Sequence, residues 1–136
     1  MNLQGFPLLV ARVLLALMFV LAGVSKLTGL EGTAGYIGSV GLPAPMVLAV
    51  ASGVVELAAG LMLIVGWQTR GAALALALFT VVASVLFHNF WAMPADKAFM
   101  QQLMFLKNLA VTGGLLFVFV FGAGSLSLDA RRGAQA

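Results

Sequence analysis

The sequence predicts an all-α membrane protein in which four helices form a bundle embedded in the bilayer. Of its 136 residues, 62% are hydrophobic and only 8% are charged, whereas soluble domains average about 25% charged residues. The mean hydropathy is +1.12, and the apolar residues gather in four blocks, each long enough to span a bilayer as a helix of about 20 residues. Open strands would leave backbone groups unpaired in lipid. A soluble globular fold is therefore excluded.

The four predicted spans follow the apolar blocks in order. They cover approximately residues 8–28, 44–66, 71–91 and 100–122, followed by a short polar tail over 125–136. We expect one transmembrane domain over residues 1–136. The first block is expected to be a retained span rather than a cleaved signal peptide, because Arg12 lies inside it and no A-x-A site follows.

The connections between the spans are short. Residues 30–40 contain three glycines and are too few to cross the bilayer. They are expected to form an interfacial half-helix or a loop. Residues 66–71 predict a tight turn, and residues 91–99 link the last two spans.

Four spans place both termini on the same side of the membrane. That side holds the arginines Arg12, Arg70, Arg131 and Arg132, and the opposite side holds the lysines Lys26, Lys97 and Lys107. The positive-inside rule favours both termini in the cytoplasm, and Arg12 and Arg70 are interpreted as structural or topology residues. No basic run with interleaved aromatics supports nucleic-acid binding.

Several classes of site are excluded by composition. The sequence contains no cysteine and one histidine, so disulfides, thiolate metal sites and cysteine nucleophiles cannot form from this chain alone. No P-loop, dinucleotide-binding or EF-hand pattern is present. We expect no metal site and no cofactor held by the chain's own ligands.

Glu56 is the most informative residue. It lies about twelve residues into the second span, near the bilayer centre, where an ionisable group needs a partner or a wet cavity. Its neighbours at helical spacing include Ala49, Gly53 and Gly60, small residues that let helices approach closely. Glu56 is therefore predicted to face the bundle interior and to pair with Lys107 or Lys26.

Further polar residues converge on the outer half of the bundle, because helical side chains lean toward the N-terminus of their own helix. The predicted set is Lys26, Glu56, His88, Asn89, Lys107 and Asn108. We expect a small polar pocket above Glu56, capped by His88 and Asn89. Arg12 leans the other way and is expected to snorkel to the headgroups.

A structural interpretation of the same residues stays open. A buried Glu–Lys pair can simply neutralise charge or fix the register of the bundle. His88, near the membrane boundary, is expected to be an interfacial hydrogen-bonding residue rather than a metal or haem ligand.

Together these elements resemble the DoxX family of small bacterial membrane proteins. The matching residues are Arg12, Ala22-Gly23-Val24-Ser25-Lys26, Gly41-Leu42-Pro43, Glu56-Leu57, Gly60, Gly66, Thr69-Arg70, His88, Gly122-x-Gly124 and Ser127-Leu128-Asp129. The resemblance implies a multi-pass protein of the bacterial inner membrane. It also implies a link to membrane oxidoreductase complexes, since the family is named after a subunit of a thiosulfate:quinone oxidoreductase. Without cysteine, the electron carrier would be a bound quinone or a group on a partner.

Three hypotheses follow. In the first, the chain is a quinone-linked oxidoreductase membrane subunit with a soluble or membrane-bound partner. Glu56 would then carry protons, Lys107 and Lys26 would be its charge partners, His88 would donate to a carbonyl, and Asn89 and Asn108 would help to bind the ligand. In the second, it is a non-enzymatic anchor or assembly subunit. In the third, it is a small proton-coupled transporter. The small-residue stripes also allow a homodimer.

Overall fold

The computed structural model describes residues 5–133, and this part of the chain is helical with no strand. Its elements are α1 (Gly5–Thr28), α2 (Leu30–Ser39), α3 (Pro45–Val65), α4 (Thr69–Phe87), η1 (Phe90–Ala92), α5 (Ala95–Phe121) and α6 (Leu128–Gly133). Four segments are long and apolar enough to cross a membrane: α1, α3, α4 extended by η1, and α5. The predicted all-α bundle with four spans is confirmed.

Two helix boundaries differ from the prediction. α4 ends at Phe87, where the His88 N–H donates to the Ser84 carbonyl and the chain turns into η1. α5 begins at Ala95, five residues before the apolar block that marks the span. Pro94 precedes its first turn and Asp96 lies in that turn, where a carboxylate favours the helix dipole. Hydropathy locates the apolar part of a span, whereas these residues set the helix ends.

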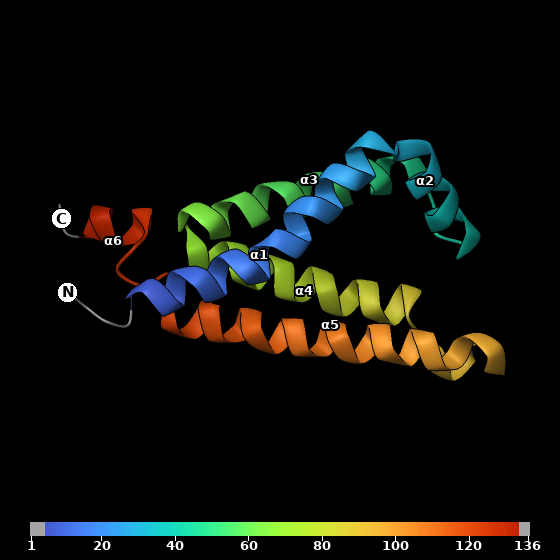
Figure 1. Cartoon of the computed structure of the whole chain (residues 1–136). Coiled ribbons are helices and arrows are strands. Elements are labelled where there is room, and N and C mark those ends of the chain that lie inside the picture. The colour runs from blue at the N-terminus through green and yellow to red at the C-terminus, as the bar shows by residue number, and fades with distance from the viewer. Residues whose placement is uncertain (1–4, 134–136) are drawn as a thin grey trace.

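The long helices form two close pairs, α1 with α3 and α4 with α5. A tight turn joins α3 to α4, and α1 has little contact with α5. Both ends of the described chain lie together, which defines a terminal end, and α2 lies at the opposite end, the α2 end (Figure 1). The two pairs are close near the terminal end and diverge toward the α2 end.

Gly23 sets the close crossing of α1 and α3. A Cβ atom on Gly23 would lie 2.6 Å from the backbone nitrogen of Leu57 and 2.8 Å from the carbonyl oxygen of Gly53. Gly53 in turn receives the side chain of Leu27. The small-residue stripe seen around Glu56 is therefore the contact surface with α1.

α2 is the half-helix that the sequence allowed between the first two spans. A small cluster of Ala34, Ile37 and Ala49 packs it on α3. The ring of Tyr36 stacks on Phe87, with 5.3 Å between centroids. α2 therefore connects the two helix pairs at the α2 end.

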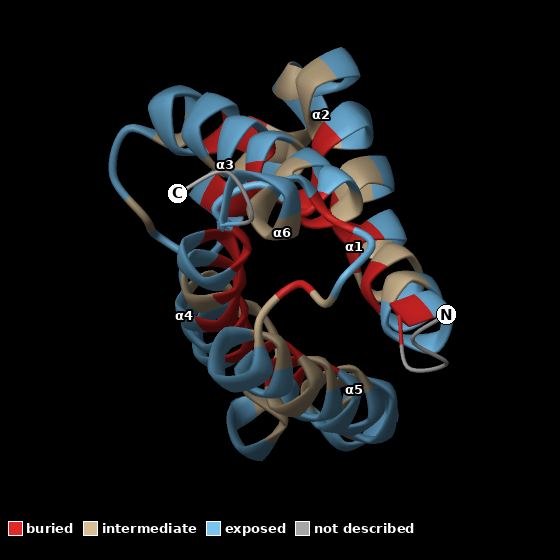
Figure 2. Cartoon of the chain, turned by 90° about the vertical axis from the view of Figure 1, so that its left-hand side faces the viewer, coloured by how far each residue is buried: buried red, intermediate tan, exposed pale blue. Residues whose placement is uncertain are grey.

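The main core fills the terminal half of the bundle. It consists of Ala16, Phe19, Ala59, Leu63, Ala72, Ala73, Leu76, Ala77 and Leu115. Viewed from the terminal end, buried residues turn inward around the ring of helices (Figure 2). This packing leaves the α2 half of the bundle as the place for a cavity. Of the predicted polar tail, residues 128–133 form α6, and 134–136 lie outside the described residues.

Candidate functional site

A cavity of about 620 Å³ lies between the two helix pairs in the α2 half. Residues of α1 to α5 contribute to its wall, which is mostly apolar. The polar wall residues are Lys26, Thr33, Ser52, Glu56, Thr80, His88, Lys107 and Asn108. Of the six residues predicted to converge, the wall includes five. Asn89 does not line the cavity, and its buried Oδ1 accepts no hydrogen bond from the described residues.

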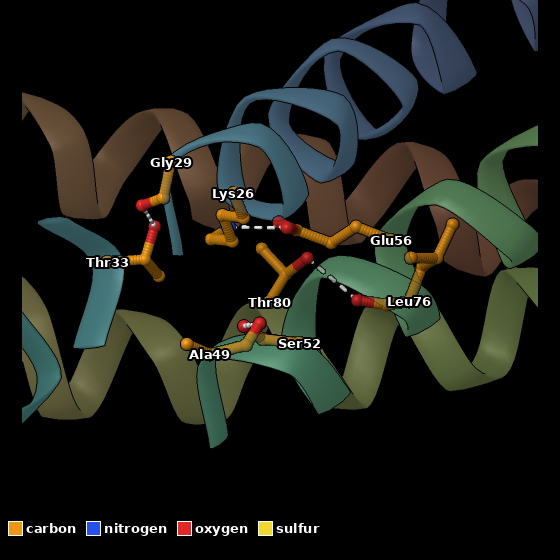
Figure 3. A network of polar contacts seen from close by, with 8 residues as sticks. All are labelled: Lys26, Gly29, Thr33, Ala49, Ser52, Glu56, Leu76 and Thr80. Carbon is orange, nitrogen blue, oxygen red and sulfur yellow. Dashed lines mark hydrogen bonds and ion pairs between the residues drawn. The ribbon is translucent and has the colours of Figure 1, made fainter. Parts of the chain in front are cut away.

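An ion pair between Lys26 of α1 and Glu56 of α3 lies on the cavity wall. The two side chains point toward one another in Figure 3, with Thr80 of α4 beside them. The Lys26 ammonium also lies 5.8 Å from the ring centroid of Phe79, a cation–π distance. Of the two amines predicted as partners of Glu56, the structure selects Lys26.

The hydroxyl groups near this pair donate to the backbone of their own helices. Thr80 donates to the Leu76 carbonyl at 2.7 Å, and Ser52 donates to the Ala49 carbonyl at 3.0 Å. Their oxygen lone pairs remain as acceptors only. Donors toward a ligand in the cavity therefore include the amines, the Asn108 amide and the Tyr36 hydroxyl.

His88 is held by a residue that the sequence interpretation did not pair with it. Its Nδ1 lies 2.7 Å from Oε1 of Gln101 in α5. This contact orients the imidazole ring beside the cavity wall. Gln101 shares a helical stripe with Asn108 and Thr112. This helical periodicity was the feature of the sequence that could have placed Gln101 at the site.

Lys107 lies at the rim of the cavity and is exposed, with Nζ 3.8 Å from the sulfur of Met104. It forms no ion pair with a described residue. Asn108, one residue further along α5, is buried on the wall. The two residues occupy the α5 side of the cavity, across from the ion pair.

The prediction that Arg12 snorkels to the headgroups is wrong. Arg12 is only 2% exposed. Its guanidinium donates to the carbonyls of Ala123, Ile64 and Leu126. After α5 the chain folds back across the terminal end, so its backbone supplies the acceptors that the headgroups were expected to supply.

Asp129 of α6 caps α4 from a distance. Its carboxylate accepts from the backbone N–H groups of Gln68 at 2.8 Å and Thr69 at 2.9 Å. Burial would raise the pKa of Asp129, but these hydrogen bonds and the charge of Arg132 outweigh it and hold that pKa below its usual value. Sequence interpretation missed this role, although Asp129 belongs to the motif that carried the family resemblance.

Arg70, predicted as a topology residue, lies at the terminal end. It lines a second cavity of about 480 Å³ together with Gly122 and Asp129. Within residues 5–133, no group of three or more His, Cys, Asp or Glu side chains could hold a metal ion.

Comparison with known proteins agrees with this architecture. The DoxX family model matches residues 7–89. Inner membrane protein YqjF of Escherichia coli (strain K12) is 37% identical over 128 residues, 94% of this chain and 93% of the relative. Inner membrane protein YphA of the same organism is 34% identical over 124 residues, 91% of this chain and 89% of the relative.

A third relative is named for an activity. The Bacillus subtilis (strain 168) protein called "Putative oxidoreductase CatD" is 33% identical over 107 residues, 77% of this chain and 78% of the relative. No solved structure matches the chain.

Proposed function

Because this chain belongs to the DoxX family and is a multi-pass inner-membrane protein, we propose that it binds a lipid-soluble quinone as the membrane subunit of an oxidoreductase. The observation that carries the proposal is the Lys26–Glu56 ion pair on the wall of a mostly apolar cavity. A few placed polar groups on apolar walls are typical of small-molecule sites. The name of the relative CatD supports the reaction class.

The cavity residues fit a quinone. The cavity volume of about 620 Å³ falls in the range of roughly 300–1,000 Å³ that ligand sites occupy. Phe79 and Phe87 supply aromatic wall for a flat ring, and Lys107 and Asn108 supply donors for carbonyl oxygens. A bound quinone would take up or release electrons together with protons.

Two residues would handle protons in this site. The Glu56 carboxylate can receive a proton at an oxygen, and Lys26 then loses its counter-charge and becomes a stronger donor toward the cavity. His88, oriented by its contact with Gln101, would be the second proton-exchanging group beside the ligand.

Electrons would pass to or from a partner oxidoreductase, soluble or membrane-bound. The chain has no cysteine, so a thiol couple would belong to that partner. We also propose that both termini lie in the cytoplasm, as the positive-inside rule favours. The cavity then lies in the outer half of the bundle.

The proposal is tested by extracting quinone from the purified protein. The protein is isolated in mild detergent, and the extract is quantified by mass spectrometry. We expect quinone near one equivalent in the wild type, and a loss of about tenfold in Glu56→Gln, equivalent to about 1.4 kcal/mol of binding energy. Glu31→Gln is the matched control, since Glu31 is an exposed residue of α2 outside the cavity wall. A wild-type extract without quinone overturns the proposal.

The second candidate is a non-enzymatic anchor subunit. It is favoured by the fact that the ion pair joins α1 to α3, the helices with the closest crossing. In that case the wild-type extract contains no quinone, and Glu56→Gln lowers stability but leaves the activity of the partner complex intact. The same purified variants therefore separate the two functions.

A further inference from the structure

The exposed side chains of the cavity wall differ in polarity between the sides of the bundle. On the α5 side, the exposed wall residue is Lys107. The seam between α3 and α4 is lined by exposed apolar side chains, Leu48 and Val55 on α3 and Val82 and Leu86 on α4. Val55 is 39% and Val82 57% exposed. The same cavity therefore has a basic side and an apolar side.

The α3/α4 seam follows from the way these two helices pack. In the terminal half, Ala59 and Leu63 of α3 belong to the same core as Ala73 of α4. Beyond this core, the helices separate toward the α2 end (Figure 1). In this half of the bundle, side chains of α3 and α4 line the cavity instead of packing against each other. In a bilayer, this opening faces lipid.

The terminal end of the bundle is covered by the chain that follows α5. At the terminal end, the guanidinium of Arg12 is bonded to the carbonyls of Ala123 and Leu126, so the returning chain lies across the bundle. At the α2 end, the ring of Tyr36 stacks on Phe87. A long apolar chain therefore has no path through the terminal end, and the exposed apolar wall available to it is that of α3 and α4.

We propose that the α3/α4 seam holds the hydrophobic tail of the ligand, whose polar head lies at the Lys26–Glu56 pair. The ligand class is thus an amphiphile that enters from the bilayer, a quinone with an isoprenoid or alkyl tail, rather than a small water-soluble quinone. This inference rests on the proposed quinone-binding function. The α5 side of the cavity is a poorer tail site because the basic side chain of Lys107 lies at that rim.

The energetics specify what to measure. Lipid tails are as apolar as the valine and leucine side chains of the seam, so a tail gains little by leaving lipid for the seam. Tailed and tail-less quinones should therefore bind the wild type with similar affinity when concentrations are expressed per lipid. Obstruction of the seam, by contrast, affects only the ligand whose tail must pass.

The experiment uses Val55→Trp and Val82→Trp in lipid nanodiscs. Their matched controls are Val54→Trp and Val81→Trp, because Val54 (49% exposed) and Val81 (45% exposed) do not line the cavity. The probes are a benzoquinone with a decyl tail and the same benzoquinone without it. We expect the seam variants to lose about tenfold in affinity for the tailed probe, as overpacking a filled site predicts. Binding of the tail-less probe should stay within about twofold, and the control variants should resemble the wild type.

Three other results would contradict the proposed tail site at the α3/α4 seam. Equal losses for both probes, or no loss for either, overturn the tail seam while the quinone site stands. Selective loss in the control variants instead places the tail elsewhere. If neither probe binds the wild type, the proposed function fails and the tail seam fails with it. Binding of the tail-less probe to each variant also reports that the variant has folded.

Discussion

The guanidinium of Arg12 donates a hydrogen bond to the backbone carbonyl of Ala123, 111 residues later in the chain. The first span thereby holds the segment that follows the last one. Two further carbonyls, of Ile64 and Leu126, accept from the same group at 3.2 and 2.9 Å. A planar guanidinium with five donors suits this task, since it can serve several fixed acceptors at once.

Replacing Arg12 should destabilise the fold strongly. Arg12→Ala removes the donors for three carbonyls and leaves a space in the terminal end, at a cost of about 2–4 kcal/mol. Arg12→Lys should recover part of this, because an ammonium replaces the planar fork with a compact charge. Thermal unfolding in detergent, followed by circular dichroism, measures both. Arg131→Ala, at an exposed position of α6, should unfold like the wild type, and an unchanged Arg12→Ala would contradict the role.

The Lys26–Glu56 pair should show strong coupling in a double-mutant cycle. Glu56→Met or Lys26→Met alone leaves one charge without its partner, which costs about 3–5 kcal/mol for a buried pair. Removing both should cost much less, since no unpaired charge remains. Reversible unfolding in mixed micelles gives the four free energies. Additive effects would mean that the pair contributes no coupling.

Asp129 should make stability depend on pH in the acid range. The pKa of the folded carboxyl is lowered, so its contribution is complete above the ordinary pKa of an aspartate and is lost as the pH falls through the folded value. Asp129→Asn should lower stability by about 1 kcal/mol at neutral pH, as loss of a helix cap does. The difference from the wild type should vanish in acid. Unfolding midpoints across that range test this, and a difference that persists in acid would refute the linkage.

Gly23 should tolerate no side chain. In Gly23→Ala the added methyl would meet the backbone of α3 at Leu57 and Gly53, forcing α1 and α3 apart at a cost of about 1–3 kcal/mol. Gly113→Ala is the control, since a Cβ there meets nothing within 4 Å. Thermal unfolding distinguishes the two substitutions. Equal stability of both variants would show that the crossing can relax.

Both termini should lie in the cytoplasm. A fluorescent protein fused after the C-terminus should fluoresce, because it folds in the cytoplasm, and alkaline phosphatase fused after η1 should be active outside it. These two fusions sample opposite ends of the bundle. The opposite pattern would invert the orientation and place the cavity in the inner half of the membrane.

The sequence predicted the local features of the candidate site well. The side on which Glu56 lies follows from the small residues around it, and helical periodicity places Lys26, His88 and Asn108 toward the same half of the bundle. Asn89 was expected beside them. However, α4 ends at Phe87, and the turn that follows leaves His88 on the cavity wall but Asn89 off it. A prediction that assumes a continuing helix fails where the helix stops.

By itself, the sequence determined the compartment, the helical class, the four spans and the inward face of Glu56, because hydropathy and periodicity are properties of neighbouring residues. Tertiary structure alone decided the partners: Lys26 rather than Lys107 for Glu56, Gln101 for His88, and the carbonyl of Ala123 for Arg12. It also decided that α3 and α4 separate beside an apolar seam. The physical reason is that these contacts join residues far apart in the chain, whose approach depends on how whole helices pack.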